Sequence, residues 1–411
     1  RDSSTSRGLG DVYKRQIWFP TVLTFAAVSL AFMGPNQRWD EALAANKWYI
    51  LIIVLCVYWA ATLLNLRGMR TSAGVTKWGT MIGTIIPGAI LILLGLSYWA
   101  GGNPILLDMS WDKLVPDMTN FNNLVLAASI FLFYAGMEMS AVHVKDVNDP
   151  GRNYPLAILI SAIITVVIFV LGTLAIGFII PNSQINLVQS LLISYDNYFS
   201  FFGLGWMNWI MALALAVGVL AQVTAWVGGP SKGLYQVGLA GNLPPVMQKR
   251  NKNNVQEGIL IIQGCIVTLL SIMFVIMPSV QSAYQIISQL TIILYLIMYM
   301  LMFASGIYLR YREPNTPRTF RIPGGKTFGM WVVGGLGFLA SLAAFLVSFI
   351  PPNQITVGSN AMYIILLVVG AFIFAGIPFV IHAMAKPSWK RPVDPEDAFE
   401  PFGWEKTNPN R

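Results

Sequence analysis

One acidic residue, Glu138, falls well inside an apolar segment of the chain, and it is the first candidate for chemistry. It closes the run Tyr134-Ala135-Gly136-Met137-Glu138, in which Gly136 supplies a backbone that can leave helical geometry. A charged group at the centre of a bilayer costs about 2.5–3.5 kcal/mol on insertion scales. Glu138 must therefore face a cavity, pair with another group or be protonated. A broken helix with polar groups at the break is typical of the midplane substrate site of secondary transporters. The alternative is a neutral, hydrogen-bonded acid that stabilises the break.

Two further pairs of residues have a spacing that could serve a binding site. Gln222 and Trp226 are separated by four positions, and so are Tyr295 and Tyr299, so each pair lies on one helix face. Interhelical packing with a satisfied hydroxyl or indole would explain the aromatic members equally well. The residues alone leave both interpretations open.

The sequence offers no catalytic, metal or cofactor motif. Cys56 and Cys265 both fall in apolar segments without metal-ligand spacing. The glycine-rich pieces at 228–233 and 322–326 lack the preceding strand and the spacing of a phosphate loop, and we predict that both are cytoplasmic turns. An intramembrane enzyme would need an acid–base pair or metal ligands at depth. A channel would more often show a symmetric filter or rings of charge.

Composition and hydropathy define the elements that must position these residues. The 411 residues are 55% hydrophobic and only 11% charged, whereas about 25% charged is usual for a soluble protein. The mean hydropathy is +0.62, which indicates an all-α polytopic membrane protein. Ten apolar segments have lengths near the ~20 residues that cross a bilayer. They are 17–34, 48–66, 78–101, 121–143, 155–180, 206–229, 258–279, 284–309, 328–350 and 361–385.

The net charge of +8 arises from basic residues in short loops, so it does not point to nucleic acid. Lys and Arg concentrate in alternate loops, including 67–77, 230–257 and 310–327. The positive-inside rule predicts that these loops and the C-terminus are cytoplasmic, with 102–120 and 181–205 on the other side. We interpret residues 1–16 as a non-native or disordered stretch, 17–385 as the transmembrane domain and 386–411 as a cytoplasmic tail.

Several motifs resemble a known transporter family. GMEMSAVHVKDVNDPGRNYPLA, from Gly136, resembles the sixth helix and following loop of the glutamate:γ-aminobutyrate antiporters, a branch of the amino acid–polyamine–organocation (APC) superfamily. LAQVTAWVGGPSKGLY is similar to their eighth helix, LTIILYLIMYMLMF to their tenth, and RTFRIPGGK to the loop that follows. The resemblance extends from about 17 to 386. It implies an APC/LeuT-like inverted-repeat fold, with the second repeat at about 121–309 and with helices one, two and part of three lacking.

The resemblance also implies a function. The chain would be a secondary active amino-acid antiporter of the inner (plasma) membrane, exchanging glutamate for γ-aminobutyrate by alternating access, as in acid resistance. The alternative is an APC permease of different specificity. The implied substrate-binding residues are Tyr134, Ala135, Gly136, Glu138, Gln222, Trp226, Tyr295 and Tyr299. The implied partners are amino-acid substrates and the lipid bilayer, with no cofactor, and the oligomeric state stays open.

One of these positions departs from the family pattern. The family antiporter best known for glutamate exchange has a glutamate where this chain has Gln222. A neutral amide therefore replaces one acidic group of the pathway. The departure leaves the substrate and its pH dependence open, but not the transporter class.

Overall fold

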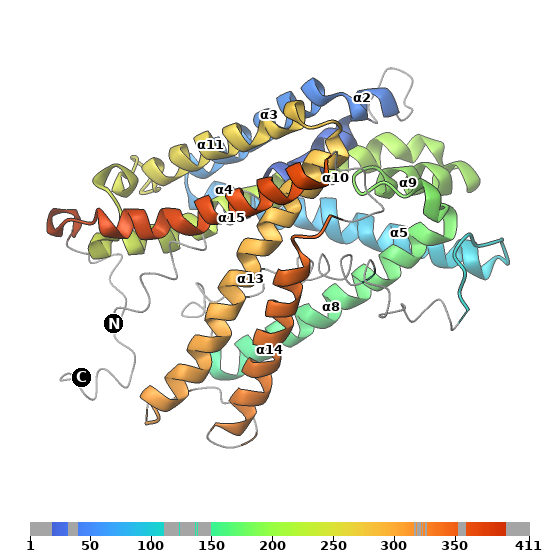
Figure 1. The fold of residues 1–411 in the computed structure, drawn as a ribbon. Helices are drawn as coiled ribbons and strands as arrows, with labels where there is room; N and C mark the ends of the chain where they lie inside the picture. The colour runs from blue at the N-terminus through green and yellow to red at the C-terminus, as the bar shows by residue number, and fades with distance from the viewer. Residues whose placement is uncertain are drawn as a thin grey trace.

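The computed structural model describes residues 19–31, 40–110, 149–315, 327–351 and 359–391, and six residues that stand singly outside these ranges. The six are Asn123, Gly136, Glu138, Arg318, Ile322 and Gly324. Within these ranges all regular secondary structure is helical (Figure 1). The expected all-α polytopic architecture is therefore confirmed.

Nine apolar helices account for nine of the ten predicted segments. Eight are long and apolar enough to cross a membrane, and Phe19–Ala31 is a shorter ninth. The tenth predicted segment, 121–143, lies outside the described residues except for Asn123, Gly136 and Glu138. The long helices are α3 Lys47–Leu66, α4 Met69–Thr80 continuing through the π-turn η1 Met81–Ile85 into α5 Ile86–Ala100, α8 Pro150–Ile179, α10 Asn208–Val237, α11 Glu257–Ser271 with α12 Met273–Ile276, α13 Val280–Arg312, α14 Phe328–Val347 and α15 Asn360–Ala383.

Short helices fill the connections between these spans. α2 covers Glu41–Ala45 and α9 covers Ser190–Phe201, the latter within the predicted loop 181–205. The single turns are η3 Asn182–Gln184, η4 Gly205–Met207, η5 Gly238–Asn242, η6 Pro245–Gln248 and η7 Pro387–Trp389. The start of the predicted tail packs on the loop after α10, because Gln248 Nε2 donates to the Trp389 carbonyl at 2.9 Å.

The prediction of a turn at 228–233 is wrong, because this piece is the interior of α10. Pro230 is buried inside the helix, and Ser231 Oγ donates to the Gly228 carbonyl at 2.7 Å. Asn65 of α3 packs against the same turn and donates from Nδ2 to the Thr224 carbonyl at 2.9 Å. Tertiary contacts therefore hold a helix where local propensity favours a turn. Of the second glycine-rich piece the structure describes only Ile322 and Gly324, and the φ of +106° at Gly324 suits a turn.

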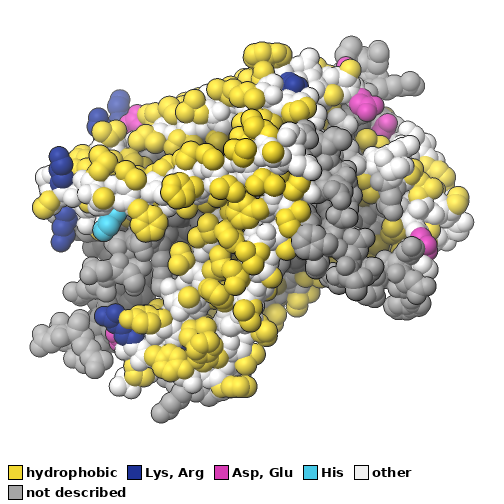
Figure 2. All heavy atoms as spheres, in the orientation of Figure 1, with side chains coloured by type: hydrophobic (Ala, Val, Ile, Leu, Met, Phe, Trp, Pro, Cys, Tyr) yellow, Lys and Arg dark blue, Asp and Glu magenta, His cyan; other side chains and the backbone are white. Residues whose placement is uncertain are grey.

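The main apolar core joins helix 19–31 to α3, α10, α11, α12, α13 and α15. Phe19, Tyr58 and Tyr363 are fully buried at its centre, and the Phe19 and Tyr58 rings meet edge to face at 5.2 Å. In Figure 1, α14 lies beside the later part of α13, and the pair runs away from the rest of the bundle. None of the most apolar window of α8 is buried within the protein, which suits a helix facing lipid tails. Figure 2 shows hydrophobic side chains spread widely over the side of the molecule where α13, α14 and α15 lie.

Candidate functional site

The Glu138 carboxylate joins two segments that are 161 positions apart in sequence. Tyr299 of α13 donates its hydroxyl hydrogen to Glu138 Oε2 at 3.1 Å. The Gly136 backbone N–H donates to the same oxygen at 3.0 Å. The other oxygen, Oε1, is buried and has no hydrogen-bond partner among the described residues. We call Gly136, Glu138 and Tyr299 the carboxylate cluster.

Gly136 is required at this position for two independent reasons. Its φ is +108°, in the region that favours glycine. A Cβ there would also stand 2.7 Å from Trp226 Cη2. The indole of Trp226 therefore packs directly on the backbone of the predicted helix break, and this contact connects α10 to the carboxylate cluster.

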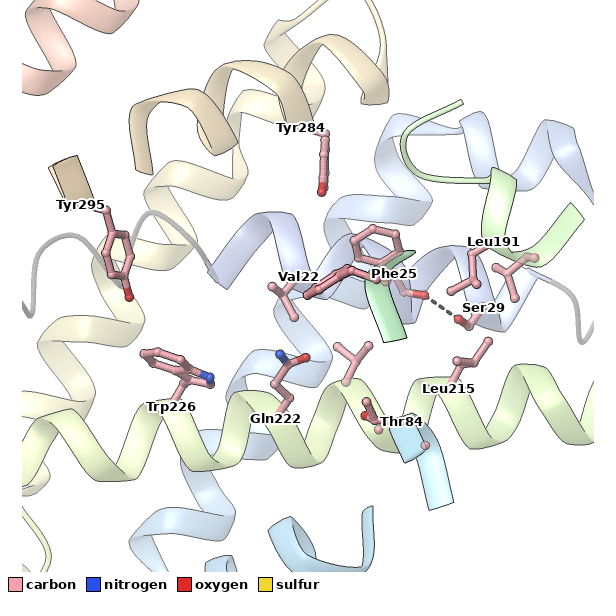
Figure 3. Close-up of a pocket in the computed structure, with 15 residues that line it drawn as sticks. Val22, Phe25, Ser29, Thr84, Leu191, Leu215, Gln222, Trp226, Tyr284 and Tyr295 are labelled. Atoms are coloured by element: carbon pink, nitrogen blue, oxygen red, sulfur yellow. Dashed lines mark hydrogen bonds between the residues drawn. The ribbon is translucent and has the colours of Figure 1, made fainter. Parts of the chain in front are cut away.

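A cavity of about 360 Å³ lies next to this cluster (Figure 3). Gln222 and Trp226 rise into it from one face of α10, and Tyr295 and Tyr284 of α13 reach it from the opposite side. Its other labelled walls are Val22, Phe25, Ser29, Thr84, Leu191 and Leu215. We call this space the central cavity, and the polar groups that the described residues contribute to its lining are all neutral side chains.

The predicted site residues divide between these two regions. Gln222, Trp226 and Tyr295 line the central cavity, whereas Glu138 and Tyr299 do not. The Tyr295 ring lies 5.9 Å from that of Tyr299, so Tyr295 touches both regions, as Trp226 does through Gly136. Tyr134 and Ala135 lie outside the described residues. The two aromatic side chains thus stand between the cavity and the carboxylate.

The wall of the cavity opposite α13 depends on a close helix crossing. Gly79, at the end of α4, and Gly83, in η1, lie four positions apart where these two elements run along α10. A Cβ at Gly83 would overlap the backbone of Gly218 and the carbonyl of Ala214. Small residues at this spacing allow helices to approach at backbone distance in a membrane. The crossing places Thr84, which follows Gly83 in the π-turn, at the cavity.

Sequence reasoning missed three polar residues of the lining, which are Thr84, Ser29 and Tyr284. A signal existed for two of them. The glycine pair before Thr84 marks a helix crossing, and Tyr284 lies eleven positions before Tyr295, which is close to three full helical turns. No spacing in the sequence singles out Ser29. Its hydroxyl donates to the Phe25 carbonyl of its own helix at 2.6 Å.

α9 closes one end of the central cavity through Leu191. It is anchored by Tyr195, which donates to the Pro87 carbonyl of α5, and by Tyr198, which donates to the Ala175 carbonyl of α8, both at 2.6 Å. Burial raises the pKa of both hydroxyls above the ordinary tyrosine value, and for Tyr198 the neighbouring Tyr98 adds to the effect. Both therefore stay neutral donors across the physiological range.

The chemistry available here is binding of small charged groups. The described residues contain no group of three or more His, Cys, Asp and Glu side chains that could hold a metal ion. An ammonium group can be attracted by the Glu138 carboxylate and by the face of the Trp226 indole. The Gln222 amide can both donate and accept, so it can meet either end of an amino acid.

Comparisons with known proteins identify the family of the chain. A family model described as amino acid permease matches residues 16–372. An uncharacterised transporter of Legionella pneumophila is 35% identical over 365 residues, which are 89% of this chain and 77% of that protein. A glutamate/gamma-aminobutyrate antiporter of Lactococcus lactis is 31% identical over 371 residues, 90% of this chain and 73% of that protein. A probable agmatine/putrescine antiporter of Lactococcus lactis is 22% identical over 283 residues, 68% of this chain and 59% of that protein. The chain therefore belongs to the amino acid permease family of the APC superfamily, and it is a multi-pass membrane transporter of amino acids, not an enzyme.

Proposed function

We propose that this transporter exchanges glutamate for γ-aminobutyrate by alternating access. The observation that carries the proposal is the Glu138 carboxylate, with one oxygen held by Gly136 and Tyr299 and the other buried without a partner in the described part of the chain. A buried acceptor without a donor is costly to keep. The unpartnered oxygen of Glu138 therefore suits a site that binds a substrate ammonium group and a proton in alternation.

The substrate pair is supported by a relative. The Lactococcus lactis protein that is named a glutamate/gamma-aminobutyrate antiporter aligns with 90% of this chain. Glutamate and γ-aminobutyrate both carry an ammonium group and a carboxylate. The central cavity, of about 360 Å³, falls within the usual range for small-ligand pockets of about 300–1,000 Å³.

The arrangement of the aromatic side chains suggests where access alternates. Tyr299 follows Tyr284 by 15 positions, so the two lie about 22 Å apart along α13 at 1.5 Å per residue. Tyr295 lies between Tyr284 and Tyr299 on this helix, and both Trp226 and Tyr295 pack against the carboxylate cluster. A substrate in the central cavity would reach Glu138 only after one of these side chains moves. We propose that this movement accompanies the rocking of one helix bundle against the other.

A second candidate function is amino-acid transport with a different substrate preference. Gln222 favours it, because a neutral amide stands in the cavity where the antiporter best known for glutamate exchange has an acid. A cavity lined by neutral groups would discriminate less between substrates of different net charge.

The decisive experiment is counterflow in proteoliposomes that contain the full-length protein. Vesicles loaded with unlabelled γ-aminobutyrate are expected to take up labelled glutamate, and empty vesicles are not. Other internal amino acids are then compared at equal concentration. Glutamate uptake driven equally well by many internal amino acids would support the second candidate, and no glutamate uptake with any of them would contradict the proposed exchange.

The proposal includes an orientation in the inner membrane, with the loop after α10 and the C-terminus in the cytoplasm. Lys249 in this loop is exposed and suits a labelling site. Cys56 and Cys265 are both exposed, so they must be replaced first. Lys249→Cys should resist an impermeant thiol reagent applied to intact cells, and Gln184→Cys, in the predicted external loop, should react. The reverse result would invert the proposed topology.

A further inference from the structure

An apolar groove of about 740 Å³ runs between α13 and α14, far along the chain from the site residues of α10. The described residues that line it are all apolar: Ala304 and Ile307 from α13, and Trp331, Val332, Gly335, Leu336, Phe338 and Leu339 from α14. Leu336 and Leu339 are more than half exposed, at 65% and 61%. Figure 1 shows α13 and α14 leaving the bundle side by side. The exposure of Leu336 and Leu339 indicates that the groove lies on the outer surface of the protein rather than in its core. We call it the α13–α14 groove.

One end of this groove carries aromatic residues with polar tips. Trp331 lines the groove and donates from Nε1 to the Tyr311 hydroxyl at 2.8 Å. The Tyr308 hydroxyl accepts a hydrogen bond from Arg312 Nη1 at 2.9 Å. All three aromatic side chains are more than half exposed. Tryptophan and tyrosine with this mixed character concentrate at the level of lipid headgroups.

The same end is positively charged. Ala304, Tyr308 and Arg312 follow one another at intervals of four, so one face of α13 leads from the groove to a guanidinium group. Arg312 presents five N–H donors, and the Tyr308 bond uses one nitrogen. Arg318 turns back on α13 and donates to the Leu309 and Glu313 carbonyls at 3.2 and 2.8 Å. Figure 2 shows basic side chains beside the hydrophobic surface at this end of the molecule.

We propose that the α13–α14 groove binds one anionic phospholipid, with an acyl chain in the groove and the headgroup phosphate on Arg312. The apolar lining suits a hydrocarbon chain, and a guanidinium suits a phosphate, which it can bind through two parallel N–H donors. Basic pockets between membrane helices on the cytoplasmic side are known to hold anionic headgroups. The described lining of the groove shares no residue with the central cavity or the carboxylate cluster, and the proposal concerns lipid recognition rather than transport.

A protein partner fits this surface less well. Protein interfaces carry about one hydrogen bond per 100–200 Å², and the lining of the groove provides apolar side chains and a glycine. A zwitterionic lipid would fill the groove equally well. It would gain less from Arg312, because each basic residue near the surface contributes about 1 kcal/mol of attraction to anionic lipid.

The headgroup is tested by native mass spectrometry of the full-length protein. The protein is released from nanodiscs that contain equal parts of phosphatidylcholine and phosphatidylglycerol, and the lipids that stay bound to it are counted. Arg312→Gln should reduce retained phosphatidylglycerol about fivefold, which corresponds to the roughly 1 kcal/mol of one basic contact. Arg67→Gln removes the same charge at the exposed C-terminal cap of α3 and should leave retention unchanged. Equal retention of the two lipids by the unaltered protein, or equal effects of the two substitutions, would overturn the proposal.

The acyl chain is tested by filling the groove. A Cβ at Gly335 would meet only Trp331 Cε3, at 3.9 Å, so Gly335→Leu can enter the groove without displacing backbone. Gly172 of α8 has no atom within 4 Å of such a Cβ, which makes Gly172→Leu a matched control. Phosphatidylglycerol with brominated chains should quench the fluorescence of Trp331, taken as the difference from Trp331→Phe. Gly335→Leu should remove this quenching and Gly172→Leu should not. Quenching that survives Gly335→Leu, or a stable dimer of the chain that covers Trp331, would refute a lipid in the groove.

Discussion

The central cavity and the carboxylate cluster are neighbours with opposite chemistry. The cavity presents Gln222, Thr84 and Ser29, which are neutral, to a space that a small solute can occupy. The cluster concentrates a carboxylate, a backbone N–H and a phenol around a single oxygen, outside the cavity lining. Trp226 and Tyr295 contact both regions. Two aromatic side chains thus separate the Glu138 carboxylate from the central cavity.

The difference in charge between the two regions suggests that they have different roles in transport. A neutral cavity can admit an amino acid at low desolvation cost, because its polar groups exchange hydrogen bonds rather than charges. A carboxylate that is only partly satisfied binds a cation or proton more strongly. We expect substitutions in the cluster to affect exchange more than substitutions in the cavity, and the following predictions test this order from the largest effect to the smallest.

Glu138→Gln should give the largest loss, a fall in glutamate exchange of between about tenfold and 100-fold, since hydrogen bonds to charged groups contribute about 1.5–3 kcal/mol. The amide keeps the shape and the acceptor for Tyr299 but cannot ionise. Exchange is measured in proteoliposomes, with thermal unfolding as the check on folding. Glu41→Gln, on the exposed helix α2, is the matched control. Undiminished exchange would reduce Glu138 to a structural role.

Gly83→Ala should destabilise the wall of the cavity by about 1–3 kcal/mol, the usual cost of overpacking. The added methyl group overlaps the backbone of Gly218. Gly88→Ala, five positions further on, meets nothing within 4 Å and should be neutral or slightly stabilising, as alanine is in a helix. Thermal unfolding in nanodiscs compares the two. Equal melting temperatures would show that the crossing is not tight.

Tyr299→Phe should lower exchange by about tenfold, because one charge-assisted hydrogen bond is lost while the Gly136 N–H still contacts the carboxylate. Tyr98→Phe removes a hydroxyl bonded to the Pro104 carbonyl at 3.1 Å, in a residue that lines neither region, and serves as the control. A Tyr299→Phe protein as active as the control would show that the hydroxyl does not prepare Glu138 for substrate.

Gln222→Glu should change the rate at neutral pH by only a few-fold but shift its pH profile toward acid. The side-chain carboxyl of free glutamate has a pKa of about 4.3, so at neutral pH the substrate carries a net negative charge that the new carboxylate repels. As the pH falls toward this value, neutral glutamate forms and the repulsion fades. Initial rates are measured across pH for both proteins, with substrates of different net charge. Superimposable profiles would mean that position 222 does not meet the substrate.

The sequence by itself determined the membrane class, nine of the helical spans and the family, because hydropathy and motif residues are local properties of the chain. It also singled out Glu138 and the paired positions on α10 and α13, since a buried charge and a spacing of four can be read without a fold. The prediction from sequence was wrong where the local conformational preference of the residues conflicts with tertiary packing. The glycine–proline run at 228–233 reads as a turn, yet Asn65 and the buried Ser231 hold it in α10.

Only the tertiary structure decided how the site residues are divided. Tyr295 and Tyr299 look equivalent in sequence, but one lines the cavity and the other donates to Glu138, 161 positions away. The reason is physical: one helical turn along α13 moves a side chain about 5–6 Å, which is enough to pass from the cavity to the carboxylate. Thr84 and Tyr284 also line the cavity. Their spacing in the sequence suggests a helix crossing and a shared helix face, but only the packing of the helices shows which residues lie across the cavity from them.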